Sequence, residues 1–478
     1  MKGNLIRPPL SFPERYFMRP PTLAPSALRL ICASVLLTLV FTVIPLKGQS
    51  ASAVPAASGN KGPSFADALK NRKHPLHILY VHGIGDDGLD DYDSYYLRRG
   101  ICETLHCPKN ERDGKLESDF IFANSAEFKP HATPPYLSFL GQVVFPVDSS
   151  GGSELWDAST PFLRRFKLAA GISPVYVDEL NWWPLVFALK CRYMVAPDAA
   201  LVGADKTTLG HCAREKQAYG NTGHFSSYPF ISPEEAARLE QIPKRGALIN
   251  RSLKGSLLDW GFTDAILSLG PMRKILLDGL GQLIQLAVQT PAAESPDATS
   301  PEEFIIVTHS LGSYLIFAAL DTSNPADPDS ATSYSYLLAH TSRVYFFANQ
   351  LRLLEMANLD VAKGSNLTRH LNGWVNTRTA YLSSIGEQAG QNPPQIVAWN
   401  DASDLLTWEV PPICGVVVEN HTVQNTFNWF GLVEGPTKAH DYYGLNPKVI
   451  HGVLNSSSHN EPPPCPAAPV AASATPSP

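Results

Sequence analysis

Short apolar runs and helix-like repeats of apolar residues alternate along the chain. The apolar runs predict strands at 76–81, 118–123, 174–180, 304–308, 343–348, 395–400 and 415–419. Between them, apolar residues at positions 276, 280, 283 and 287 have the spacing of one helix face and predict a helix over 272–289. This alternation predicts an α/β protein with a mostly parallel sheet and helices on both faces.

Three segments fall outside the alternation. Residues 54–74 are small, polar and Pro-containing and predict a linker, and residues 456–478 are rich in Ser, Pro and Ala and predict a disordered tail. The stretch at about 181–260 predicts either a lid ahead of the strand at 304–308 or a long decorated surface loop. It contains a capping pattern at Ser232 that predicts a short helix. The predicted globular domain therefore covers residues 75–455.

The N-terminus has the pattern of an export signal. Basic residues precede an uncharged apolar run, Leu30–Ile44, and small residues follow it. The run is short for a membrane span, which needs about 20 residues. It predicts a signal peptide over 1–53 and a periplasmic or secreted protein, with either Met1 or Met18 as the start. A retained membrane anchor over 30–46 is the alternative.

Charge and cysteine content narrow the class of protein. The formal net charge is −6 at pH 7, and no basic patch with interleaved aromatic residues occurs, so we expect no nucleic-acid partner. An even number of cysteines follows the predicted signal, which in an exported protein favours disulfides. The shortest loops favour Cys102–Cys107 and Cys191–Cys212. No Cys/His spacing is typical of zinc, and we expect no metal or organic cofactor.

The most informative stretch is the end of the strand at 304–308. The strand runs into Thr308-His309-Ser310-Leu311-Gly312, and an apolar, helix-favouring run follows at once. A strand, a sharp turn and a helix with serine at the apex are the layout of a nucleophile elbow. That layout exposes the Ser310 hydroxyl and offers backbone N–H groups to an oxyanion. Thr308 stands where the G-x-S-x-G pattern has glycine, and an ordinary N-cap serine is the alternative reading.

A second strand also ends in a glycine turn, His82-Gly83-Ile84-Gly85. In the elbow mechanism one oxyanion donor comes from such a loop, and the other is the N–H that follows the nucleophile. We therefore expect the backbone N–H groups of Ile84 and Leu311 to hold the oxyanion. We expect His82 to support the loop and not to take part in the chemistry.

A serine nucleophile also needs a base and an acid. Asp401 and Asp404 follow the strand at 395–400, and we favour Asp404 as the acid and expect the other to be an Asx-turn or capping residue. His440, in a predicted loop after the last strand, is the favoured general base. His421, at the end of that strand, is the second candidate.

Together, these motifs resemble the α/β-hydrolase superfamily over about residues 75–455. The HSLG form of the elbow is similar to lipases and GPI-inositol-deacylase-like proteins. The resemblance implies an α/β-hydrolase fold and a serine hydrolase that cleaves a carboxylic or lipid ester through an acyl-enzyme. It also implies membrane association through the lipid substrate or the N-terminal apolar run. The alternative is a non-catalytic α/β-hydrolase-fold binding or structural protein of the cell envelope.

Overall fold

The computed structural model describes sixteen segments of the chain, all within one compact unit, Gly59–Pro478. They are 61–83, 92–109, 118–122, 161–168, 173–204, 209–210, 212–213, 217–218, 225–226, 231–245, 262–289, 303–321, 328–358, 369–386, 393–425 and 436–459.

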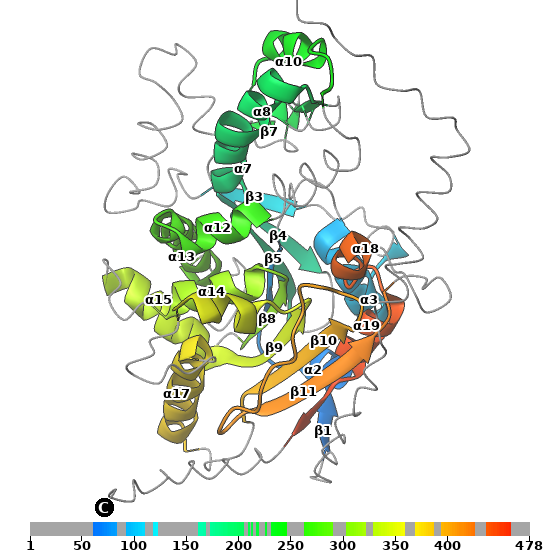
Figure 1. Ribbon diagram of the computed structural model, residues 1–478. Coiled ribbons are helices and arrows are strands. Elements are labelled where there is room, and N and C mark those ends of the chain that lie inside the picture. The colour runs from blue at the N-terminus through cyan, green and yellow to red at the C-terminus, as the bar shows by residue number, and fades with distance from the viewer. Residues whose placement is uncertain are drawn as a thin grey trace, which may run out of the picture. The chain divides into compact units, whose positions relative to one another are not determined.

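An eight-stranded sheet forms the centre of this unit, in the order β11-β10-β9-β8-β2-β5-β4-β3 (Figure 1). The strands from β11 to β5 run parallel, and β4 pairs antiparallel with both of its neighbours, β5 and β3. The mixed, mostly parallel sheet confirms the predicted α/β class. The bounds are β2 Leu76–Val81, β3 Ser118–Phe122, β4 Phe162–Leu168, β5 Val175–Asn181, β8 Glu303–His309, β9 Thr341–Phe347, β10 Gln395–Asp401 and β11 Val417–Val423.

Helices cover both faces of the sheet because successive strand side chains point to opposite sides. In β8, Ile306 joins one apolar layer, and Ile305 and Val307 join the other. The first layer is completed by α13 Arg273–Gln289, α14 Gly312–Leu320, α15 Pro328–His340 and α17 Arg369–Ser384. The second is completed by α2 Phe65–Asn71, α3 Tyr92–Leu105 and α19 Pro447–Asn455. Helix α13 confirms the helix predicted over 272–289, with its stripe of apolar residues buried.

The predicted linker over 54–74 is wrong where it overlaps β1 Lys61–Ser64 and α2. Helix α2 begins at a capping box between Ser64 and Asp67 and buries Phe65 and Leu69, one turn apart, in the core. The composition of this stretch did not predict the helix, because small and polar residues surround the two apolar ones.

The predicted tail is likewise wrong at its start. Strand β12, Ser457–His459, pairs antiparallel with β1 and so holds the two ends of the unit together. The rest of the predicted tail and the predicted signal over 1–53 lie outside the described residues. Within the described segments, no helix combines the length and apolarity needed to cross a membrane.

The stretch at about 181–260, predicted as a lid or a surface loop, begins with two buried tryptophans and continues with helices. Trp182 and Trp183, directly after β5, are fully buried. Helix α7, Pro184–Lys190, then runs through a π-helical turn, Cys191–Val195, into α8, Ala196–Val202, and the region also contains α10, Pro233–Glu240 (Figure 1). As predicted, Ser232 caps α10, since its Oγ accepts the Glu235 N–H at 3.1 Å.

Both favoured cysteine pairs form disulfides. The Cα atoms lie 4.9 Å apart in Cys102–Cys107 and 5.6 Å apart in Cys191–Cys212. The first closes the end of α3, and the second ties the π-helical turn to a residue 21 positions later in the chain. Cys414 is disulfide-bonded as well.

Candidate active site

The residues predicted to carry the chemistry meet at one edge of the sheet. Strands β2, β8 and β10 belong to the parallel part, so their carboxyl ends lie on the same side. Gly83 follows β2, Ser310 follows β8 and Asp404 follows β10, and His440 comes from α18, Pro436–Asp441. The structure brings Ser310, His440 and Asp404 into one hydrogen-bonded chain.

Ser310 occupies a sharp turn between β8 and α14. Its φ angle is 53°, a left-handed conformation that residues with a side chain rarely adopt. The Ser310 N–H donates to the Phe347 carbonyl at 2.8 Å, which ties the turn to the end of the neighbouring strand β9. A strained serine between a strand and a helix has the backbone geometry of a nucleophile elbow.

Two glycines allow this turn to pack against the end of β2. A Cβ on Gly312 would lie 2.5 Å from the Val81 carbonyl oxygen, and a Cβ on Gly83 would lie 2.7 Å from the Ser310 Cβ. Both contacts are too close for any side chain, so glycine is required at each position. Thr308, at the first glycine position of the G-x-S-x-G pattern, is fully buried in strand β8.

The chain of hydrogen bonds runs from serine to acid. Ser310 Oγ lies 2.6 Å from His440 Nε2, and His440 Nδ1 lies 3.0 and 2.9 Å from Asp404 Oδ1 and Oδ2. With its proton on Nδ1, the imidazole donates to the carboxylate and accepts from the serine hydroxyl. All three side chains are buried, and a low-dielectric surrounding strengthens such a chain.

The two candidate aspartates have different partners. The Asp401 carboxylate accepts the backbone N–H groups of Ser403 at 2.8 Å and Asn425 at 2.6 Å, so it fastens the turn after β10 to the segment after β11. Asp404 meets His440, and its Oδ1 also accepts the Leu406 N–H at 2.9 Å. Asp401 therefore has the Asx-turn contacts expected of the aspartate that is not the acid.

His440 lies in the short helix α18, and the prediction of a loop at this position is wrong. Two side chains that the sequence did not single out secure this helix. His309 Nε2 donates to the His440 carbonyl at 2.8 Å, and the Asn425 amide donates to the Ala439 carbonyl at 2.7 Å. The residue just before Ser310 thus supports the backbone of His440.

Tyr443 is a further site residue that sequence reasoning missed. Its hydroxyl accepts the Asp401 N–H at 2.6 Å and donates to Asp404 Oδ2 at 3.2 Å. Burial, and then the charge of Asp404, raises the pKa of Tyr443 above its ordinary value, so the phenol stays protonated. Only its position three residues after His440 could have drawn attention to it.

Of the two expected oxyanion donors, the structure describes one, Leu311. Leu311 lies at the start of α14, and among the residues that the structure describes no acceptor lies within hydrogen-bonding range of its N–H. An N–H in that position, next to Ser310, is available to a developing oxyanion. Ile84, the second expected donor, lies outside the described residues.

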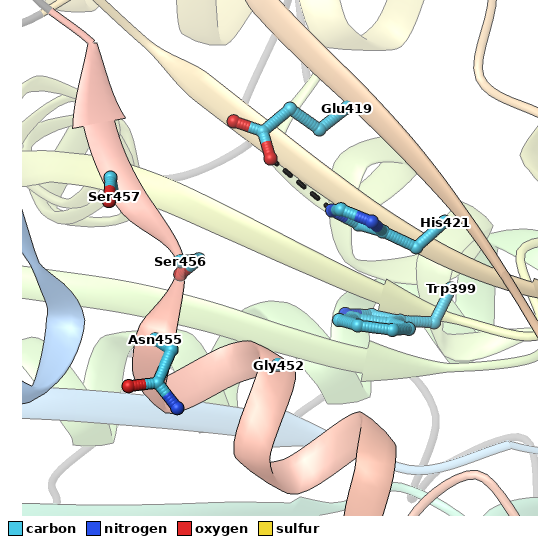
Figure 2. A pocket seen from close by; sticks show the side chains of 7 residues that line it. All are labelled: Trp399, Glu419, His421, Gly452, Asn455, Ser456 and Ser457. Carbon is cyan, nitrogen blue, oxygen red and sulfur yellow. Dashed lines mark hydrogen bonds and ion pairs between the residues drawn. The ribbon is translucent and has the colours of Figure 1, made fainter. Parts of the chain in front are cut away.

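The second candidate base, His421, lines a different pocket and has other partners than Ser310. Its Nε2 lies 3.3 Å from Glu419 Oε2, and its ring stacks on Trp399 with centroids 4.5 Å apart. Figure 2 shows this pair above the indole, in a cavity of about 230 Å³ that the end of α19 completes. The histidine in contact with Ser310 is His440.

His82, expected to support its loop, has supporting contacts. Its Nδ1 lies 2.9 Å from the Gly83 carbonyl oxygen, and its ring stacks on Trp182 with centroids 5.0 Å apart. These contacts fix the end of β2 against the start of the helical region after β5. They also place Gly83 against Ser310.

Comparisons with known proteins add no relative. No protein-family model matches the chain, and neither the curated proteins nor the solved structures contain a significant match. Across the described segments, no group of three or more His, Cys, Asp or Glu side chains is arranged to hold a metal ion.

Proposed function

We propose that the protein is an exported serine hydrolase of the α/β-hydrolase superfamily that cleaves a carboxylic or lipid ester. The observation that carries the proposal is the 2.6 Å contact between Ser310 Oγ and His440 Nε2, with Asp404 on the far side of the imidazole. A serine in a left-handed turn, a histidine in contact with it and a buried carboxylate are the parts of an acyl-transfer site.

The reaction would pass through an acyl-enzyme. Ser310 Oγ attacks the ester carbonyl carbon while His440 Nε2 takes the serine proton, and the carbonyl oxygen becomes an oxyanion held by the Leu311 N–H. The tetrahedral intermediate collapses as His440 returns the proton to the leaving alcohol. Water then attacks the acyl-enzyme by the same route, and Asp404 fixes the imidazole tautomer and stabilises its charge in both halves.

Ester substrates and export rest on different support. The resemblance of the HSLG elbow to lipases favours an ester, although the same groups also act on amides and thioesters. The disulfides Cys102–Cys107 and Cys191–Cys212 favour an oxidising compartment, in agreement with the apolar N-terminal run.

Turnover of p-nitrophenyl butyrate by purified protein tests the proposal. We expect Ser310→Ala to lose at least about 10³-fold in kcat with an unchanged circular dichroism spectrum. Ser268→Ala is the matched control, because Ser268 is also fully buried but bonds only to the Asp264 carbonyl, in α12, Thr263–Leu269. Full activity in a folded Ser310→Ala protein would reject the nucleophile. No turnover of any acyl ester by the wild type would support the non-catalytic alternative instead.

A further inference from the structure

We propose that Tyr443 is a positioning residue that sets the hydrogen bonding and effective charge of Asp404, and through it the basicity of His440. The inference rests on the proposed function, because it assigns a role within the same site. Tyr443 touches neither Ser310 nor the oxyanion donor in the contacts described, so it would act through the acid.

The geometry makes Tyr443 the link between the two aspartates. Its hydroxyl accepts from the backbone of Asp401 at 2.6 Å and donates to the carboxylate of Asp404 at 3.2 Å. Asp401 is itself fastened to the Asn425 N–H at 2.6 Å. The turn after β10 therefore fixes the Tyr443 hydroxyl through a hydrogen bond, and that hydroxyl in turn fixes the Asp404 carboxylate.

The donors to Asp404 are distributed evenly over its two oxygens. Oδ1 accepts the Leu406 N–H at 2.9 Å, Oδ2 accepts the Tyr443 hydroxyl at 3.2 Å, and His440 Nδ1 lies within 3.0 Å of both. Each donor stabilises the ionised carboxylate and keeps the carboxyl plane directed at the imidazole. Without the phenol, Oδ2 would have only the imidazole as its partner within the described part of the chain.

A predictable change in His440 follows from removing the hydroxyl. Among the described residues, the polar groups in contact with His440 are Ser310, His309 and Asp404, and Tyr443 in turn contacts Asp404. Because Tyr443 disperses part of the negative charge of Asp404, its loss leaves a more strongly charged partner beside the imidazole. That partner stabilises the imidazolium form of His440 relative to the neutral form.

The test is the pH profile of p-nitrophenyl butyrate hydrolysis by Tyr443→Phe. We expect the acidic limb of kcat/KM to move to higher pH by about 0.5 to 1 unit. We expect kcat at the plateau to fall on the order of tenfold, because the acid is held less firmly, with KM within about twofold of wild type.

Tyr345→Phe is the matched control. Tyr345 is also fully buried in the same apolar layer as Tyr443, but its hydroxyl pairs with Ser456 Oγ at 2.7 Å and not with either aspartate. The same atom is removed from the same type of buried residue. We therefore expect Tyr345→Phe to lower the stability of the protein but to leave the acidic limb of the kcat/KM profile where it is in wild type.

A second variant keeps the proposal testable if Tyr443→Phe does not fold. Replacing Tyr443 with 3-fluorotyrosine preserves its size and strengthens its donor, so the acidic limb should move to lower pH. An unmoved limb in either folded variant, or the same shift in Tyr345→Phe, overturns the proposal. Wild-type turnover separates the outcomes, since its absence would reject the proposed function and not the role of Tyr443.

Discussion

Ser310 Oγ lies 2.6 Å from His440 Nε2, although 130 positions separate the two residues in the chain. Ser310 is held by the strained turn after β8, and His440 by the carbonyl contact of its own helix with His309. The residue next to Ser310 thus also fixes the backbone of His440. The site therefore depends on how α18 is positioned against the end of β8, and not only on the side chains of Ser310 and His440.

The acid is tested by replacing each aspartate with asparagine. Asp404→Asn should fold and lose on the order of 10³–10⁴ in kcat, because an amide does not hold the imidazole in the reactive tautomer. Asp401→Asn should remain active. Steady-state kinetics with p-nitrophenyl butyrate checks both.

We expect Asp401→Asn to lower the free energy of unfolding by more than the loss of an Asx turn alone, because Asp401 also binds a second backbone N–H. An asparagine can accept one of the two N–H groups now bound by Asp401, and the other loses its acceptor. We expect about 1–3 kcal/mol lower free energy of unfolding, measured in urea. Swapped kinetic phenotypes would assign the acid to Asp401.

Gly312→Ala tests the close packing of the turn. The new Cβ would lie 2.5 Å from the Val81 carbonyl and 2.6 Å from the His82 carbonyl, and backbone atoms cannot move aside cheaply. We expect a loss of about 1–3 kcal/mol in the free energy of unfolding, together with reduced activity. Thermal and urea unfolding measure the first effect.

Gly373→Ala is the control for the same substitution. Gly373 lies within helix α17, and nothing lies within 4 Å of the position of its missing Cβ. Alanine should stabilise the helix there by roughly 0.5–1 kcal/mol. Equal effects at the two positions would show that the turn does not depend on the missing side chain.

Glu355 predicts a pH-dependent stability that is independent of the active site. Burial raises the pKa of Glu355 to about 8, and the carboxyl oxygen Oε2 has no hydrogen-bond partner among the residues that the structure describes. The folded protein therefore keeps a proton that the unfolded chain releases above its ordinary pKa of 4.5. Between these values stability falls as the pH rises, and the loss is complete above about 8.

Glu355→Gln should remove this loss. Relative to wild type, the variant should gain free energy of unfolding progressively between pH 5 and pH 9, as measured by urea unfolding. Glu240→Gln, at an exposed position in α10, is the control and should show no such trend. A difference between Glu355→Gln and wild type that stays constant with pH would contradict the buried, protonated carboxyl.

Strands β2, β8, β9 and β10 could be predicted because they are buried almost throughout and contain apolar runs. Strand β4 could not, because Arg164, Arg165 and Lys167 interrupt its sequence. The structure explains one of them, since Arg165 is buried and donates to Asp178 at 2.7 and 3.0 Å. A buried ion pair across two strands is invisible until both strands are placed.

The site shows the same division. Ser310, Asp404 and His440 could be selected by motif and order, because each follows a recognisable strand. Tyr443 could not, because its role depends on a turn that brings Asp401 and Asp404 to one phenol. Contacts that depend on how loops fold back carry little local sequence signal.

Export predicts a defined mature protein. The N-terminus should begin near residue 54, as measured by intact mass after expression with the full chain. Non-reducing peptide mapping should recover Cys102–Cys107 and Cys191–Cys212. A retained residue 1–53 segment in a membrane fraction would favour the anchor, and free thiols at all four positions would contradict an oxidising compartment.

The most direct measurement is labelling with a fluorophosphonate probe, followed by mass-spectrometric mapping of the modified residue. The account predicts a single adduct on Ser310 in native protein and none after denaturation, because only the native contact with His440 activates the hydroxyl. His440→Ala should label far more slowly. An adduct at another residue, or undiminished labelling of a folded Ser310→Ala protein, would contradict the assignment.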